Sequence, residues 1–262
     1  MQRVTILGSG AAPGVPSVAY GWGRCNPNNP KNRRLRSGTY LEFDNTKILV
    51  DTSPDLRLHM INNDIHRLDA VLLTHAHADH LHGIDDLREI NRITRAPIDF
   101  YATPEALSMA TQRFEYLFSH EGRRFRPIDY PMLIPHKVEF GEKFTVKNIV
   151  IEPIKLNGHN LQSTGYAFNE GQIILIADFE TIEDEVIEKY ANKAELLIMP
   201  LTTPNKVPYH ADLNMVLEYI YKFNPQKAVL THMAVECDYD EINNQTPDFV
   251  FAGYDGLKID LK

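Results

Sequence analysis

Residues 74–83 read THAHADHLHG and directly follow the apolar run AVLL, residues 70–73. Four side chains that can bind metals fall within six residues of this segment: His75, His77, Asp79 and His80. A short, continuous apolar run is typical of a strand that is buried on both faces, and ligand sites commonly open at the carboxyl end of such a strand. Imidazole and carboxylate groups together suit divalent transition metals. The segment therefore predicts a metal site at a strand end, against the alternative of a histidine-rich, solvated turn.

Strand and helix signals alternate through the rest of the chain, without a repeat or a low-complexity run. Residues 11–37, rich in Gly, Pro, Asn and Arg, predict a long loop, and a long loop in a compact domain is usually functional or mobile. Further strands are predicted at 4–7, 39–43, 48–50, 144–154, 166–168, 173–176, 196–199, 228–230, 249–251 and 257–259, and helices at 54–63, from 104 onward, at 182–191 and at 212–222. Strand-rich halves flanked by helices indicate sheets stacked between helical layers. We expect one domain over residues 1–262.

The composition limits the classes of protein to which the chain can belong. Its hydrophobic fraction of 43% and charged fraction of 24% are those of an ordinary globular chain. A formal net charge of −8 disfavours charge-driven binding to extended nucleic acid. The two cysteines, Cys25 and Cys237, are too few for a disulfide framework and predict reduced thiols. The first residues lack a secretory pattern, and no apolar stretch approaches the length of a membrane span. We therefore expect a cytoplasmic protein.

The pattern HxHxDHxxG, residues 75–83, resembles the signature of the metallo-β-lactamase superfamily. That resemblance implies a four-layer αββα sandwich, an α/β (α+β) fold built from two mixed sheets. It also implies three further ligands in a fixed order along the chain. The sequence offers a candidate for each: His159 in NGHN, Asp178 at the end of LIAD, and His232 directly after VLT. The resemblance therefore covers nearly the whole chain.

Carried over position by position, the resemblance implies two divalent metal ions. One ion would take His75, His77 and His159, the other would take Asp79, His80 and His232, and Asp178 would bridge the two. A set of nitrogen and oxygen donors suits Zn²⁺ or Mn²⁺, and Fe²⁺ as well. The residues alone leave other interpretations open, because His159 could be a loop histidine bonded to backbone and Asp178 a helix N-cap. Asp51 either orients a ligand histidine or caps the helix that follows.

Outside the metal set, the resemblance assigns a catalytic role to His210, and to Asp79 in addition to its role as a ligand. His210 lies in PYHADL before a predicted helix and resembles the histidine that phosphodiesterases of this superfamily place over the substrate. A histidine there can protonate the leaving alkoxide or stabilise the charge of the phosphorane. A surface histidine is the alternative. Arg33, Arg34 and Arg36 in the first loop are candidates for binding phosphate. A second arginine cluster lies within residues 123–126, and either cluster could instead be a solvated loop.

Several weaker motifs narrow the resemblance within the superfamily. Asp178 stands where the commonest zinc β-lactamases have a cysteine in the second metal site, so antibiotic hydrolysis is not expected. The segments GSG at 8–10, PGVP at 13–16, NRRLRS at 32–37 and YDGL at 254–257 resemble phosphoribosyl 1,2-cyclic phosphate phosphodiesterases. Many of those proteins hold a structural zinc in a cysteine cluster of the first loop, but this loop has only Cys25. We therefore predict no third metal.

The sequence thus predicts a metal-dependent hydrolase that cleaves a small sugar or nucleotide phosphodiester, cyclic or linear, with a hydroxide that bridges the metals. One alternative is an endonuclease of the tRNA 3′-processing type, which shares the metal core but needs a broad basic surface. An alternative of another class is a non-catalytic sensor that uses the metals to hold a nucleotide. A small phosphodiester is the expected partner and extended nucleic acid is not. The sequence does not determine the oligomeric state, and a homodimer is compatible with the general frequency of such assemblies.

Overall fold

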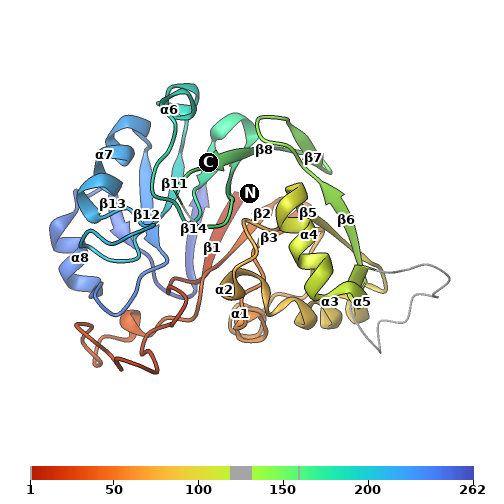
Figure 1. The fold of residues 1–262 in the computed structure, drawn as a ribbon, viewed down its shortest axis with the longest axis horizontal. Coiled ribbons are helices and arrows are strands. Elements are labelled where there is room, and N and C mark those ends of the chain that lie inside the picture. The colour runs from red at the N-terminus through yellow and green to blue at the C-terminus, as the bar shows by residue number, and fades with distance from the viewer. Residues whose placement is uncertain (1, 119–131, 159) are drawn as a thin grey trace.

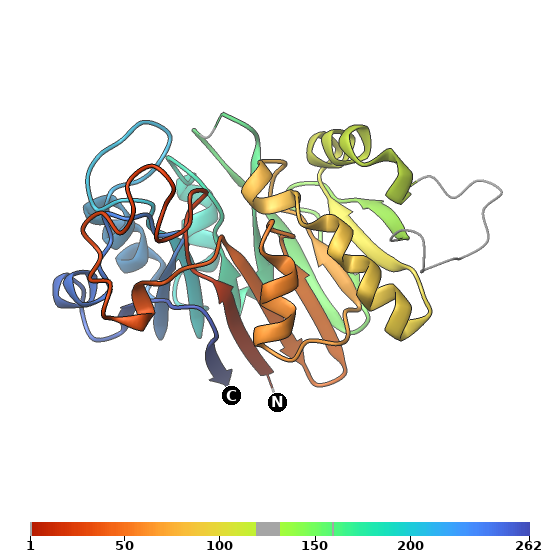
Figure 2. The same cartoon turned by 90° about the horizontal axis from the view of Figure 1, so that it is seen from below.

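The computed structural model describes residues 2–118, 132–158 and 160–262. In this part of the chain two seven-stranded mixed sheets pack face to face, and helices cover the outer face of each sheet (Figure 1, Figure 2). The strand orders are β14-β1-β2-β3-β4-β5-β6 in one sheet and β13-β12-β11-β10-β9-β8-β7 in the other. The αββα sandwich that the sequence predicted is confirmed.

The elements have the following bounds. The strands are β1 (Gln2–Gly8), β2 (Gly38–Phe43), β3 (Thr46–Val50), β4 (Ala70–Leu72), β5 (Ile98–Ala102), β6 (Leu133–Lys137), β7 (Phe144–Val146), β8 (Ile149–Leu156), β9 (Ser163–Phe168), β10 (Ile173–Leu175), β11 (Leu196–Pro200), β12 (Lys227–Thr231), β13 (Val250–Ala252) and β14 (Leu257–Leu261). The α-helices are α1 (Leu56–Asn62), α2 (Ala78–Leu81), α3 (Leu87–Thr94), α4 (Pro104–Arg113), α5 (Glu115–Phe118), α6 (Asp184–Tyr190), α7 (Leu213–Phe223) and α8 (Tyr239–Gln245). Short 3₁₀ turns lie at Pro30–Asn32, Ile84–Asp86 and Asn169–Gly171.

Strand β4 shows why a run of apolar residues precedes the histidine segment. It lies between β3 and β5, and both pairings are parallel. Because successive side chains of a strand point to opposite faces, Ala70 and Leu72 enter the core between the two sheets, whereas Val71 and Leu73 pack under the helices. All four are buried completely. Strand β12 follows the same rule, with Val229 between the sheets and Ala228 and Leu230 against the helices.

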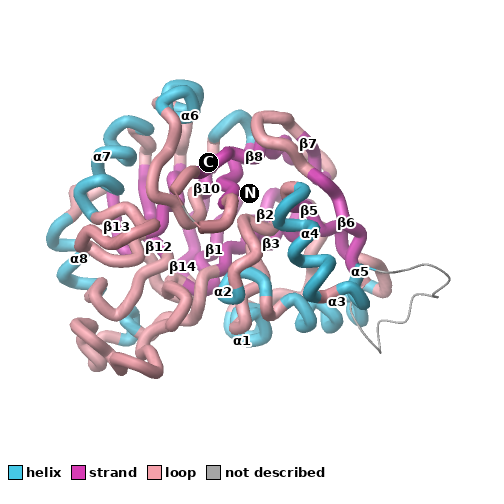
Figure 3. The backbone as a smooth tube through the Cα atoms, in the orientation of Figure 1, coloured by secondary structure: helices cyan, strands magenta, loops and turns pink. Residues whose placement is uncertain are grey.

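The two sheets bring the carboxyl ends of their ligand-bearing strands close together. Strands β3 to β6 run parallel in the first sheet, and β10 to β13 run parallel in the second. Strands occupy the middle of the molecule and helices its outer sides, with loops filling the edges (Figure 3). The carboxyl ends of β4, β10 and β12 carry the histidine segment, Asp178 and His232 respectively. The histidine segment therefore follows the carboxyl end of a buried strand, where the sequence predicted a metal site.

Two features of the chain differ from or extend the sequence prediction. Residues 144–154 were expected to form one strand, but they form the hairpin of β7 and β8, so this expectation was wrong. The chain turns at Lys147, whose φ of 53° lies in the left-handed region. The long loop before β2 is confirmed, and it lies beside α8 (Figure 1), to which it is tied by an ion pair from Arg24 to Glu241. No helix in the described residues combines the length and apolar character needed to cross a bilayer.

His59 on α1 is a completely buried histidine that packs against bare backbone. A methyl group added to Gly8 would lie 2.6 Å from His59 Nε2, and one added to Gly38 would lie 2.9 Å from its ring, so both strands need glycine at these positions. Strand β1 changes register against β2 between Ile6 and Gly8, next to this ring. Burial lowers the pKa of His59 to about 4. The folded protein therefore keeps His59 neutral at pH values where the unfolded chain would protonate it.

This burial predicts a loss of stability in acid. Because the folded pKa lies below the unfolded value of 6.5, the contribution of His59 is complete above pH 6.5 and falls as the pH drops toward 4. His59→Gln should reduce the difference in unfolding free energy between pH 7 and pH 4.5 by about 2–3 kcal/mol. Urea unfolding of the metal-free protein at several pH values measures this. His66→Gln, at an exposed site, is the matched control, and an unchanged pH slope in His59→Gln would contradict the prediction.

Candidate metal centre

The segment between β4 and α3 folds into a compact turn that points its polar side chains inward. Thr74 fixes its start, because its backbone N and Oγ1 both donate to Asp51, at 2.8 and 2.9 Å. Helix α2 then places Asp79 and His80 in the interior, where they are 8% and 2% exposed. Gly83 closes the turn by donating its backbone N to Thr52 O at 2.8 Å. A Cβ at Gly83 would lie only 1.9 Å from a backbone oxygen, which explains the glycine of the motif.

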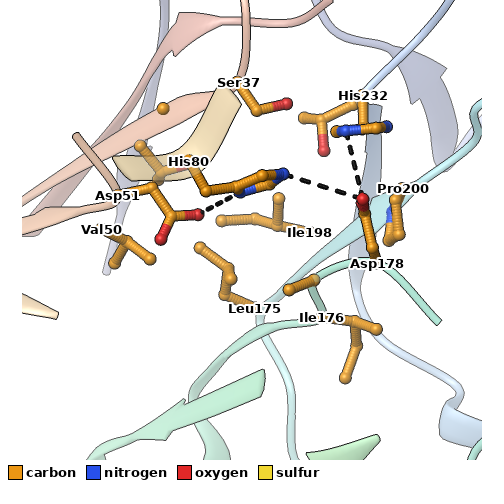
Figure 4. A pocket seen from close by; sticks show the side chains of 14 residues that line it. Ser37, Val50, Asp51, His80, Leu175, Ile176, Asp178, Ile198, Pro200 and His232 are labelled. Atoms are coloured by element: carbon orange, nitrogen blue, oxygen red, sulfur yellow. Dashed lines mark hydrogen bonds and ion pairs between the residues drawn. The ribbon is translucent and has the colours of Figure 1, made fainter. Parts of the chain in front are cut away.

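Two groups of three residues could each hold a metal ion, because the ligand atoms within each group lie within 4.8 Å of one another. His75, His77 and Asp178 form the first triad, and Asp79, His80 and His232 form the second triad. Asp178 also approaches the second triad, since its Oδ2 lies 3.3 Å from His232 Nε2 and 3.7 Å from His80 Nε2 (Figure 4). The structure thus brings together six of the seven residues that the sequence predicted as ligands, with Asp178 between the triads. His159, the seventh, lies outside the described residues.

The spacing of the donor atoms fits divalent cations. Two donors that each lie about 2.1 Å from a tetrahedral ion are separated by about 3.4 Å. In the second triad, Asp79 Oδ2 lies 3.3 Å from both His80 Nε2 and His232 Nε2. His80 Nε2 is buried and makes no hydrogen bond within the described part of the chain. In the first triad, His75 Nε2 lies 2.9 Å from His77 Nδ1 and 4.0 Å from Asp178 Oδ2. The donors are of the kind that zinc and manganese accept.

The charges of the site support the same interpretation. Burial alone would raise the pKa of Asp79 and of Asp178, but the adjacent imidazoles hold both well below the usual carboxylate range. Conversely, burial alone would lower the pKa of His80, whereas the carboxylates of Asp51 and Asp79 raise it well above its ordinary value. Buried carboxylates therefore stay ionised and favour a positive partner, either a proton or a metal ion. Metal binding and protonation compete for the same nitrogens.

Asp51 lies behind the second triad and orients one of its ligands. Its Oδ2 lies 2.7 Å from His80 Nδ1, the ring nitrogen that faces away from Asp178 (Figure 4). Asp51 is 5% exposed and follows β3 with a φ of 66°. The residue at the start of α1 is Asp55, so Asp51 does not cap that helix. A carboxylate that accepts from Nδ1–H leaves Nε2 of His80 as the nitrogen for a cation. A cavity of about 30 Å³, lined in part by Asp51, His80 and Asp178, lies behind these ligands.

A larger cavity, of about 370 Å³, opens over the two triads. Its lining includes His77, Asp79, Asp178 and His232 on the triad side, residues 11–13 of the first loop, and Tyr209 and His210 from the loop before α7. The His210 ring stacks on that of His232, with 6.2 Å between the ring centroids. Burial lowers the pKa of His210. The structure therefore places His210 in the wall of this cavity and not on the outer surface.

The three arginines of the first loop do not line that cavity within the described residues, and each has a partner inside the protein. Arg34 is 2% exposed and donates to Asn32 Oδ1 at 3.2 Å and to the Cys25 thiol. Arg36 binds both carboxylate oxygens of Asp55. The guanidinium of Arg33 lies 5.1 Å from the ring centroid of Trp22. These contacts organise the loop and give no support to a role in binding phosphate. The cluster within residues 123–126 lies outside the described residues.

The role of Asp51 can be tested by substitution. Asp51→Asn keeps the size of the side chain but weakens the acceptor for His80 Nδ1–H, so we expect the affinity for Zn²⁺ to fall about 10–100-fold. Isothermal titration of the metal-free protein with Zn²⁺ measures this, with circular dichroism as a check of folding. Asp69→Asn is the control. The Asp69 carboxylate lies far from the site and accepts hydrogen bonds from the Lys47 backbone N and from Lys147 Nζ. Equal Zn²⁺ affinity in the wild type and in Asp51→Asn would show that His80 needs no such orientation.

Comparison with known proteins agrees with this geometry. The model of a family described as "Beta-lactamase superfamily domain" matches residues 46–233. An octanoyltransferase of Porphyromonas gingivalis is 30% identical over 259 residues, which cover 98% of this chain and 51% of that protein. A ribonuclease Z of a Bradyrhizobium species is 26% identical over 121 residues, 45% of this chain and 40% of that protein. The chain spans about half or less of the length of these two relatives.

A solved structure resembles the entire chain. It is described as a new diphosphatase from the PhnP family, with a TM-score of 0.89 and 26% sequence identity. The likeness covers 100% of this chain and 98% of the other. The two chains therefore share one architecture from end to end, including the strands that carry both triads.

Proposed function

The chain belongs to the beta-lactamase superfamily, and we propose that within it this protein is a binuclear metal-dependent hydrolase of small sugar or nucleotide phosphodiesters. One observation carries the proposal: two triads, of whose residues only His77 is not fully buried, open on a cavity whose wall holds His210. Two of the similar proteins have names that denote cleavage of bonds to phosphorus, a ribonuclease and a diphosphatase. The cavity has the size of an ordinary small-molecule site.

The proposed cofactors are two divalent ions, Zn²⁺ or Mn²⁺, with Fe²⁺ as a further candidate. His75 and His77 would hold one ion together with His159, the second triad would hold the other, and Asp178 would touch both. Two such ions bring the pKa of a bound water close to 7 and offset the negative charge of phosphoryl oxygens. The chain's own part is to hold the ligands rigidly, by means of Asp51 and Thr74.

His210 is the proposed group that acts on the substrate directly. It lines the cavity together with residues 11–13 of the first loop, and it belongs to neither triad. In hydrolysis, water adds its OH to phosphorus while the bond from phosphorus to the leaving oxygen breaks, and that oxygen keeps the electron pair and gains a proton. An imidazole at this place can supply a hydrogen bond or the proton to the leaving oxygen.

Three other activities are tested by the experiment described below. The similarity to a ribonuclease Z makes cleavage of a tRNA precursor one of them, although the net charge of −8 disfavours binding of extended nucleic acid. The octanoyltransferase is about twice as long as the region that this chain matches. If this chain acted on acyl groups, an ester of octanoic acid would be a suitable model substrate. A sensor would bind metal and nucleotide without turnover.

The direct experiment loads the full chain with Zn²⁺ or Mn²⁺ and measures both metal content and hydrolysis. The substrates are bis(p-nitrophenyl) phosphate, cyclic nucleotides, a tRNA precursor and p-nitrophenyl octanoate. We expect about two metal ions per chain and turnover of the small diesters. Metal binding without turnover of any diester would favour the sensor, and preference for the tRNA precursor or the octanoate would overturn the assignment to small phosphodiesters.

Substitution separates the catalytic group from the ligands. His210→Ala should keep both metal ions but lose about 10²- to 10⁴-fold in kcat for a cyclic nucleotide, the range expected for general acid catalysis. Asp178→Ala should lose or scramble both ions, which makes it the positive control for metal loss. His136→Ala, on strand β6 and remote from the site, should resemble the wild type in both measurements. Loss of metal from His210→Ala would make that residue a ligand instead.

A further inference from the structure

Thr202 connects a metal-ligand candidate to the proposed catalytic histidine. Its hydroxyl oxygen lies 3.1 Å from Nδ1 of His232 and 3.2 Å from Nδ1 of His210. Thr202 follows the carboxyl end of β11 by two residues, next to the strand that carries His232. Its backbone carbonyl accepts a hydrogen bond from Ala234 N at 3.0 Å. One hydroxyl group therefore stands between two imidazole rings, held in place by its own backbone.

The direction of these two hydrogen bonds follows from the metal site. Nε2 of His232 lies 3.3 Å from carboxylate oxygens of both Asp79 and Asp178, which makes it the nitrogen that faces a cation. A neutral imidazole that gives Nε2 to a metal carries its proton on Nδ1. That N–H donates to Thr202 Oγ1. A hydroxyl has a single proton, which then points to Nδ1 of His210, so this nitrogen is the acceptor.

We propose that Thr202 is a positioning residue that holds His210 in the tautomer with its proton on Nε2, so that His210 donates a hydrogen bond to the leaving oxygen of the substrate. This inference rests on the proposed metal-dependent hydrolysis. As the bond to phosphorus breaks, the leaving oxygen takes the electron pair, and Nε2–H stabilises the negative charge until the proton released by the attacking water reaches that oxygen. A metal ion held by Nε2 of His232 would thus determine, through the hydroxyl group of Thr202, which nitrogen of His210 is the donor.

Two variants of Thr202 test the inference. Thr202→Ser keeps the hydroxyl and should keep the tautomer. Thr202→Val has nearly the same shape but can neither accept from His232 nor donate to His210. Thr202 is only partly buried, so the valine variant replaces a side chain that is not enclosed by the core. A purely structural role for Thr202 would affect folding or metal content, and it would leave the tautomer of His210 unchanged.

The first test is spectroscopic and needs no turnover. Two-bond ¹H–¹⁵N correlations of the Zn²⁺-loaded, ¹⁵N-histidine-labelled chain report the tautomer of each neutral ring, and His210→Ala identifies the signal of His210. We expect the Nε2–H tautomer in the wild type and in Thr202→Ser, and a mixture of tautomers in Thr202→Val, at equal zinc content. An Nδ1–H tautomer in the wild type, or a pure Nε2–H tautomer in Thr202→Val, would overturn the inference.

The second test uses the leaving group. A hydrogen bond to the leaving oxygen matters for a sugar alkoxide and little for p-nitrophenolate, which is a good leaving group. Thr202→Val should therefore lose about 10–100-fold in kcat on a 2′,3′-cyclic nucleotide, as expected for a misplaced catalytic group, and much less on bis(p-nitrophenyl) phosphate. The double variant Thr202→Val/His210→Ala should be no slower than His210→Ala alone. Additive losses would overturn the inference.

Failure of the proposed function would be visible separately. In that case the wild-type, zinc-loaded chain would hydrolyse neither diester, while the NMR measurement would still show whether Thr202 sets the tautomer of His210. Turnover in the wild type with equal losses on both substrates in Thr202→Val would instead leave the hydrolase standing and remove the role of Thr202.

Discussion

Three carboxylates, Asp51, Asp79 and Asp178, are buried within one small volume at the edge of two packed sheets, and the rest of the site is arranged to compensate their charge. Buried anions are costly unless cations or hydrogen-bond donors accompany them. The surrounding imidazoles provide hydrogen-bond donors, and the distances between the ligand atoms of each triad leave room for a divalent ion. The sandwich makes this possible because a fully apolar core below the site fixes the strand ends that carry the ligands. A flexible scaffold would let the carboxylates separate and hydrate.

Residues 11–13 of the first loop line the cavity, and the C-terminal part of the chain holds this loop in place. Asp255 accepts hydrogen bonds from the backbone N of Ser9 at 2.9 Å and of Leu35 at 2.6 Å, at the two ends of the loop. Burial raises the pKa of Asp255 to about 6. Asp238 binds Asn26 and Asn32 within the same loop. The segments that resembled phosphodiesterases in the sequence, at 8–10 and 254–257, are therefore joined in space.

Much of the fold and the site could be predicted from the sequence because the relevant signals are local. The apolar run of β4 and the dense ligand motif are each short patterns in the sequence. The later ligands, Asp178 and His232, were found because the family resemblance implies their order along the chain. The contacts of the first-loop arginines could not be predicted, because charge in a sequence does not reveal a partner such as Asp55 or a buried setting such as that of Arg34. Thr202 gave no signal, since a threonine after a strand is ordinary. Its role depends on two histidines that only the folded chain brings to its hydroxyl group.

The central claim is that the two triads hold a pair of divalent ions that share Asp178. A crystal structure of the Mn²⁺-loaded protein, with an anomalous difference map measured at the manganese edge, tests it most directly. The account predicts two peaks about 3.5–4 Å apart, one against His75 and His77, the other against Asp79, His80 and His232, with the Asp178 carboxylate in contact with both. A single peak, or peaks remote from these side chains at full metal loading, would contradict it.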